Sequence, residues 1–230
     1  MSSSCRNTAQ PATHEEPGRP SHLPASVAAA LFPAMFASVS TDRPPTEQLP
    51  PWANLLERFY ARIKLPLPEV ARLLGHEVPE PYRRLLVHSN DMTPTLEAFY
   101  RRPMGIAVLS REREGADYLR EVILKPVGEA RPVEYGVIRI CLEHLPAAAR
   151  QHVLEERRPL GNILQTETIA HLSWPQAFFR VEADSHMTRV LGLHRRVALY
   201  GRRNVLLDGS RRLLADVLEV LAPADQPRTL

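Results

Sequence analysis

The sequence predicts an α+β fold in which helices flank an antiparallel β-sheet. From residue 105 onward, segments rich in β-branched and aromatic residues follow one another closely and are separated by short turns. Two helix-like patches interrupt this series, and Asp208-Gly209 is a turn dipeptide that would join the last two strands as a hairpin. The connections are too short and the helices too few for a doubly wound parallel sheet.

Hydrophobic periodicity gives the individual elements. The first helix is predicted after Trp52, where apolar residues recur at helical spacing: Leu55, Leu56, Phe59, Tyr60 and Ile63. A second helix is expected at 69–74, ended by Gly75, and a third at 82–88. Thr93 followed by Pro94 predicts the start of a fourth, with the hydroxyl as its cap. Later helices are expected at 146–157 and 185–193, and strands at 105–111, 118–127, 133–142, two weaker ones within 166–183, 197–207 and 213–221.

Composition divides the chain into a tail, a domain and a short end. The first fifty residues hold eight of the 22 prolines and show no sustained period, which predicts a disordered extension over 1–50. The domain is expected over 51–224, followed by a tail at 225–230. A chain of 230 residues is long enough for one well-buried core with such an extension.

Charge and cysteine content exclude several classes of function. Lys and Arg number 29 against 26 Asp and Glu, acidic residues are interspersed with the Arg pairs, and no DNA- or RNA-binding signature is present. We therefore expect no nucleic-acid partner. Cys5 and Cys141 form no disulfide framework, which predicts a reduced, cytoplasmic protein. No apolar run is long enough to span a membrane. For the oligomeric state, we expect a monomer or a weak oligomer.

Alternation along the strands places two charges on apolar faces. Arg120 shares a face with Tyr118, Val122 and Leu124, and Glu219 is the lone carboxylate on the face of the last strand that holds Val217. An unpaired buried charge costs several kcal/mol, so each needs a partner, a ligand or protonation. Two structural explanations are open: the residues pair with each other or with local charges, or they reach water at a sheet edge. The functional explanation is a pocket in which Arg120 holds a carboxylate and Glu219 handles a hydroxyl or proton.

Two further charged residues have the parity of core positions. Glu134 is expected on the same strand face as Ile138, and Arg203 on the same strand face as Val205. For both, we favour an edge position that lets the head group reach solvent over a place in the pocket. Phosphate-loop, nucleophile-elbow and metal-ligand motifs are absent from the sequence, and His171 is expected to be a structural hydrogen-bonding residue.

The sequence resembles the chorismate lyases, also called 4-hydroxybenzoate synthases, over residues 80–224. The matching stretches occur in that family's order: Asp91-Met92-Thr93, Tyr118-Leu119-Arg120-Glu121-Val122, Pro159-Leu160-Gly161, Tyr200-Gly201-Arg202-Arg203 and Leu218-Glu219. The resemblance implies an antiparallel sheet with helices around an internal pocket closed by helical flaps. It also implies elimination of enolpyruvate from chorismate, giving 4-hydroxybenzoate (or a close isomer) and pyruvate without a metal or organic cofactor.

The same resemblance assigns roles to four residues. Arg120 corresponds to the arginine that binds the carboxylate and Glu219 to the glutamate near the ring hydroxyl, so both are the candidate catalytic residues. Met92 and Leu160 correspond to the two other positions that contact the substrate, a chorismate-like carboxylate.

Two departures keep other functions open. The Pro-rich N-terminal third is absent from the shorter bacterial members, and Glu134 is an acid where an apolar residue is expected. If Glu134 faces the cavity, its acid group disfavours binding of a dianion such as chorismate there.

One alternative function is a non-catalytic domain that binds a small aromatic acid, like the effector-sensing domain of a family of bacterial transcription regulators with this fold. Those regulators carry a winged helix-turn-helix that is not recognisable here. The other is a lyase for a related cyclohexadiene carboxylate.

Overall fold

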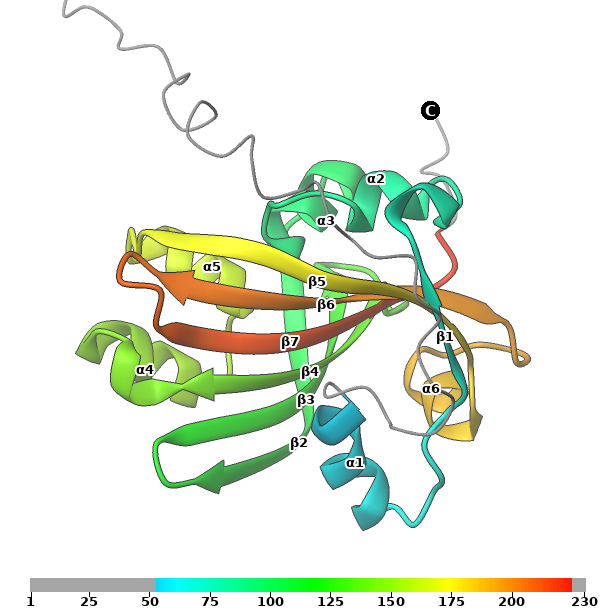
Figure 1. The fold of residues 1–230 in the computed structure, drawn as a ribbon, viewed down its shortest axis with the longest axis horizontal. Coiled ribbons are helices and arrows are strands. Elements are labelled where there is room, and N and C mark those ends of the chain that lie inside the picture. The colour runs from blue at the N-terminus through cyan, green and yellow to red at the C-terminus, as the bar shows by residue number, and fades with distance from the viewer. Residues whose placement is uncertain (1–52, 225–230) are drawn as a thin grey trace, which may run out of the picture. The chain divides into compact units, whose positions relative to one another are not determined.

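The computed structural model describes residues 53–224, and these form one seven-stranded antiparallel sheet with helices on both faces (Figure 1). The predicted fold class is confirmed. The strand order is β1-β5-β6-β7-β4-β3-β2, and every neighbouring pair is antiparallel. The expectations for the extension at 1–50 and the tail at 225–230 lie outside the described residues.

The strands and helices are as follows. The strands are β1 (Val70–Leu73), β2 (Met104–Glu114), β3 (Asp117–Pro126), β4 (Glu134–Cys141), β5 (His171–Glu182), β6 (Ala198–Asp208) and β7 (Leu213–Leu221). The α-helices are α1 (Ala53–Arg62), α2 (Tyr82–Leu86), α3 (Met92–Tyr100), α4 (Ala147–Leu154), α5 (Leu160–Thr166) and α6 (Ser185–Val190), with short 3₁₀ turns at Gly75–Glu77 and Leu142–His144. None of the helices between residues 53 and 224 has the length and hydropathy needed to cross a bilayer.

The two faces of the sheet bury different apolar clusters. One face packs against α1 and α6, where Phe59 and Met187 meet sheet residues such as Val137 and Leu218. The other face carries two clusters, one beneath α4 and α5 and one beneath α2 and α3. The boundary between these two clusters is where the candidate site lies.

Three sequence expectations about these elements were wrong. Residues 70–73 form strand β1 rather than a helix, because they pair with 178–181 at the sheet edge and Pro66 and Pro68 favour extended backbone before them. Helix α3 begins at Met92 with Asp91 as its N-cap, two residues before the predicted cap Thr93.

The third error is over 166–183, where one long strand replaces the predicted pair. Residues 160–166 form α5, and β5 then runs for 12 residues with an irregularity between Pro175 and Ala177. Pro175 interrupts the strand pattern in the sequence. It is tolerated because β1 pairs only with residues 178–181 of β5, so no hydrogen bond to β1 is lost at this position.

Candidate functional site

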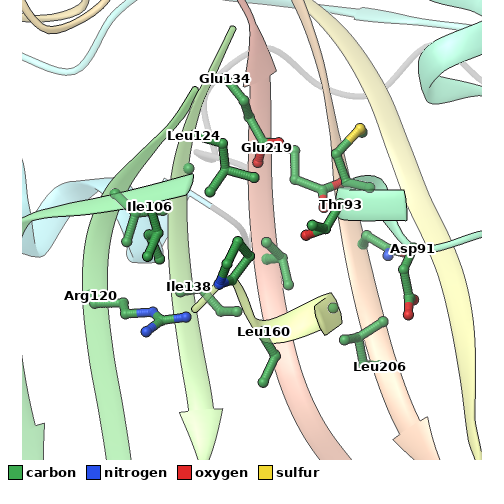
Figure 2. Close-up of a pocket in the computed structure, with 17 residues that line it drawn as sticks. Asp91, Thr93, Ile106, Arg120, Leu124, Glu134, Ile138, Leu160, Leu206 and Glu219 are labelled. Carbon is green, nitrogen blue, oxygen red and sulfur yellow. The ribbon is translucent and has the colours of Figure 1, made fainter. Parts of the chain in front are cut away.

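An internal cavity of about 60 Å³ lies between the sheet and the first turns of α3 and α5. Its floor is formed by side chains of β2, β3, β4, β6 and β7, and its roof by Asp91–Thr93 and Pro159–Gly161. Apolar side chains make up most of the wall: Met92, Ile106, Val122, Leu124, Ile138, Leu160, Leu206 and Val217. All four residues that the sequence singled out, Met92, Arg120, Leu160 and Glu219, line this one cavity (Figure 2).

Arg120 is buried at one side of the cavity, and no residue between 53 and 224 forms an ion pair with it. Its side chain projects from β3 and the residue is 1% exposed. The Nε and Nη1 atoms have no hydrogen-bond partner among the described residues. Burial lowers the pKa of Arg120 to about 10, and Tyr118 and Glu156 oppose this shift. Since unpaired buried charges are costly, this arginine is a ready binding group for an anion.

Glu219 is paired, but its partner is Arg202 rather than Arg120. The two residues lie opposite each other on β7 and β6, and Arg202 Nε donates to Glu219 Oε2 at 2.5 Å. Of the structural explanations, pairing of Arg120 with Glu219 is therefore wrong, whereas pairing with a local charge is confirmed for Glu219. Arg120 lies on β3 and Glu219 lies on β7, and β4 separates these two strands in the sheet.

Arg202 also holds the loop that leads into α3. Its Nη1 atom donates to the backbone oxygens of Leu86 and His88 at 3.2 and 3.0 Å, and Nη2 donates to that of Asn90 at 3.0 Å. Arg202 is fully buried, so these bonds and the Glu219 pair satisfy it without solvent. Strand β6 thereby positions the loop from which Asp91 and Met92 reach the cavity roof.

Glu134 lines the cavity, and the expectation of a solvent-reaching edge position was wrong for it. Strand β4 is internal, between β3 and β7, and its residue 134 lies on the face that the cavity and its roof cover, where it is 4% exposed. Its Oε2 atom has no hydrogen-bond partner among residues 53–224. Burial, and then the neighbouring Glu219, raise the pKa of Glu134 well above its usual range, with Arg202 acting in the opposite direction. Burial also raises the pKa of Glu219, against the influence of Arg202.

Arg203, by contrast, stays out of the cavity and its head group reaches solvent, as expected, but the expected edge position was wrong because β6 lies between β5 and β7. It lies on the opposite face of β6 and makes a two-pronged ion pair with Asp216, with Nε–Oδ1 and Nη2–Oδ2 distances of 2.9 and 2.8 Å. Its side chain is partly open to solvent.

The sequence analysis did not predict the structural role of Arg202, and it did not predict that the polar residue Asn204 lines the cavity. Asn204 lies two residues along β6 from Arg202 and donates from Nδ2 to Ser173 Oγ at 2.9 Å. Its Oδ1 atom is buried without a partner in the described part of the chain, and the residue lines the cavity. Strand parity was the signal that could have found both, because 202 and 204 share a face with the apolar Leu206.

Gly136 leaves the floor of the cavity open. It pairs with Val122 on one side and with Glu219 on the other, and an added Cβ would lie 3.2 Å from Val122 Cγ2 and 3.4 Å from Glu134 Oε1. A side chain here would therefore occupy the space between Arg120 and the two glutamates.

We expect Gly136→Val to keep the fold and to abolish ligand binding in the cavity. Valine is a favourable strand residue, so the free energy of unfolding should change by no more than about 1–2 kcal/mol. Any rise in melting temperature that 4-hydroxybenzoate causes in the wild-type protein should disappear in this variant. Gly209→Ala is the control, because an added Cβ in the β6–β7 turn meets nothing within 4 Å. An undiminished ligand shift in Gly136→Val would place the ligand elsewhere.

An Asp91–His171 pair closes the edge of the cavity roof. His171 Nε2 lies 2.8 Å from Asp91 Oδ2, and His171 Nδ1 lies 2.8 Å from the backbone oxygen of Ile169. His171 is thus the structural hydrogen-bonding residue that was expected. The hydrogen bond to Asp91 is the largest cause of a raised pKa of His171, and burial opposes it.

This pair predicts a pH-dependent contribution to stability. Because the pKa of His171 is raised in the folded protein, the ion pair contributes fully below the unfolded value of about 6.5 and is lost as pH rises through the folded value. His171→Gln should lower the free energy of unfolding by roughly 1 kcal/mol at pH 5.5, and by less at pH 9. Denaturant titrations at both pH values test this. Asp91→Asn should remove the same contribution, and the double change should add little; additive losses would contradict the pairing.

Together these features define an α+β domain with a cavity beneath α3 and α5. Within residues 53–224, this cavity has a guanidinium without an ion-pair partner at one side and two carboxyl groups at another. Figure 2 shows Glu134 and Glu219 close together and Arg120 apart from them across the cavity. No known family model matches the chain, and no curated protein matches it.

Solved structures of similar topology include ligand-binding domains of bacterial regulators. The effector domain of PhnF from Mycobacterium smegmatis is 13% identical, with a TM-score of 0.47, covering 61% of this chain and 93% of that one. The ligand-binding domain of a putative GntR-family transcriptional regulator from Bordetella bronchiseptica is 12% identical, with a TM-score of 0.42 and coverages of 56% and 92%. A GntR-family transcriptional regulator from Bacillus cereus is 12% identical, with a TM-score of 0.41, covering 55% of this chain and 97% of that one. Likenesses at this level identify neither a ligand nor an activity, and membership of the chorismate lyases is not confirmed.

Proposed function

We propose that this domain binds a small organic carboxylate in the internal cavity, with Arg120 as its anchor. The observation that carries the proposal is the buried guanidinium of Arg120, which lines a cavity with mostly apolar walls and has two atoms without a partner among the described residues. A carboxylate matches a guanidinium in charge and planar geometry and can accept two hydrogen bonds from it. The apolar wall suits the hydrocarbon part of the ligand.

The size of the cavity bears on how a ring would enter. About 60 Å³ is less than the ~150 Å³ of an engineered protein cavity that holds benzene. A six-membered ring therefore requires the roof to move outward. The contact that would open is between α3 and α5, where Gly161 packs so tightly on Thr93 that an added Cβ would lie 3.0 Å from Thr93 Oγ1.

A pair of isosteric ligands tests the proposal. 4-Hydroxybenzoate should raise the melting temperature, because a ligand that binds only the folded state stabilises it by mass action. The neutral 4-hydroxybenzamide has the same shape but no charge for Arg120, and should raise it little at the same millimolar concentration. Equal shifts from both compounds would remove Arg120 as the anchor. If neither these compounds nor smaller hydroxy acids such as lactate gave a shift, the cavity would not be a carboxylate site.

The second candidate function is elimination of enolpyruvate from chorismate. It is favoured by one observation, that Met92, Arg120, Leu160 and Glu219 meet around one mostly apolar cavity. Aromatisation drives this reaction, so the protein needs mainly to hold and orient the substrate. Glu134 weighs against it, because it adds an acid where a dianionic substrate would lie. Incubating the pure protein with chorismate and measuring pyruvate release is the test; no pyruvate above the uncatalysed rate rules this function out. A lyase for a related cyclohexadiene monocarboxylate avoids the conflict with Glu134.

A further inference from the structure

Two carboxyl groups share one side of the cavity with a single cation. Glu134 on β4 and Glu219 on β7 face the same cavity, and the register places Glu219 opposite Gly136, two residues along β4 from Glu134. Arg202 is the cation beside them. Charged or titratable groups packed around this side of the cavity are Glu219, Arg202, His88 and Asp91, with Arg120 across the cavity.

Four of the five N–H donors of Arg202 are already used within residues 53–224. Nε is bonded to Glu219, Nη1 to the backbone oxygens of Leu86 and His88, and Nη2 to that of Asn90. One guanidinium thus balances one carboxylate, and the second acid is uncompensated. An uncompensated buried carboxyl group takes up a proton, and Glu134 is the one without a hydrogen bond to its Oε2 atom.

We propose that Glu134 is a specificity-determining residue, which remains protonated beside the Glu219–Arg202 pair and selects ligands with a neutral hydroxyl opposite the carboxylate. The inference rests on the proposed carboxylate site. A protonated carboxyl group both donates and accepts, so it can complete both hydrogen bonds of a hydroxyl group. A second carboxylate on the ligand would instead lie beside Glu219 with no free cation, which disfavours dicarboxylates. The ligand class is therefore a small hydroxy monocarboxylate.

Ligand selectivity in two Glu134 variants tests this. The wild-type protein should bind 4-hydroxybenzoate at least tenfold more tightly than benzoate in calorimetric titrations, and terephthalate no better than benzoate. Glu134→Leu should reduce the ratio of the first two affinities to about one, mainly by weakening 4-hydroxybenzoate. Glu134→Gln should retain most of the ratio, because an amide also donates and accepts. An unchanged ratio in Glu134→Leu, or terephthalate binding to wild type as tightly as 4-hydroxybenzoate, overturns the assignment.

A second readout needs no ligand. A carboxyl group whose pKa is raised on folding makes the protein lose stability as pH rises from the unfolded value of about 4.3 through the folded value. The ligand-free Glu134→Gln variant should therefore gain stability relative to wild type between pH 6 and pH 9. A difference that does not change with pH overturns the protonated state. Failure of every carboxylate to bind wild type would reject the proposed function, whereas binding with unaltered selectivity in Glu134→Leu rejects only the role of Glu134.

Discussion

Arg120→Met should make the ligand-free protein more stable and at the same time abolish binding of 4-hydroxybenzoate. Methionine is of similar length and apolar, so it removes a buried charge that has two unpartnered atoms without opening a large void. Replacing a buried ion pair with well-packed apolar residues is often neutral or stabilising by about 1–4 kcal/mol, and a buried charge without a partner is the more costly case. In a domain of this size each kcal/mol corresponds to roughly 2–4 °C in melting temperature.

The effect on binding should be larger than the effect on stability. Hydrogen bonds to a charged group contribute about 1.5–3 kcal/mol each, so losing a two-pronged contact weakens binding about a hundredfold or more. Arg120→Lys keeps the charge but not the planar fork, and should still cost about 2–3 kcal/mol of affinity. Calorimetric titration and thermal unfolding of the same samples measure both quantities.

Arg203→Met is the matched control for this experiment. Arg203 lies on the other face of the sheet, and both prongs of its guanidinium are already bonded to Asp216. Its replacement should lower stability modestly, by about 1 kcal/mol, because the pair is partly exposed, and should leave ligand affinity unchanged. A destabilised Arg120→Met protein would mean that the wild-type guanidinium is compensated within the fold, which would remove the main argument for an anion site.

Arg202→Met is expected to be among the most destabilising single changes in the domain, with a loss of about 3–5 kcal/mol. It leaves Glu219 buried beside Glu134 without a cation, and it removes the donors to the three backbone oxygens of the 86–90 loop. The Leu86 oxygen still accepts from His88 N and the Asn90 oxygen from Ser173 Oγ, so the loss is greatest at the His88 oxygen. Chemical denaturation measures the loss, and hydrogen exchange at residues 86–95 should show faster opening of the roof.

A double change separates the two contributions of Arg202. Arg202→Met combined with Glu219→Leu should recover the cost of the broken ion pair, because no unpaired carboxylate remains at position 219. Faster exchange in the loop should persist, since its carbonyl groups still lack their donor. Glu219→Gln alone should keep the fold, because the amide oxygen can still accept from Arg202 Nε. A loss below about 1 kcal/mol in Arg202→Met would contradict the role assigned to this residue.

Sequence alternation determined which side chains face the cavity, because every strand has a period of two and a one-residue slip would bury the opposite face. The parity of Arg120 and Glu219 with apolar neighbours was sufficient to mark both as exceptional, and both line the cavity. Met92 and Leu160 entered only through the family resemblance, and they too lie at the cavity. The strands from 105 onward, except the pair predicted within 166–183, and the turn at Asp208-Gly209 followed from local composition in the same way.

Which charges pair was decided only by the tertiary structure. Pairing depends on strand order, and β7 lies between β6 and β4 although it is last in sequence, so Glu219 meets Arg202 rather than Arg120. The same order makes β4 internal, which turns Glu134 from an expected edge residue into a buried acid. Residues 70–73 became a strand because the open edge of β5 was there to pair with them. These outcomes depend largely on contacts between segments far apart in the chain, and the local signals, the prolines before β1 and the predicted β6–β7 hairpin, were not sufficient to predict them.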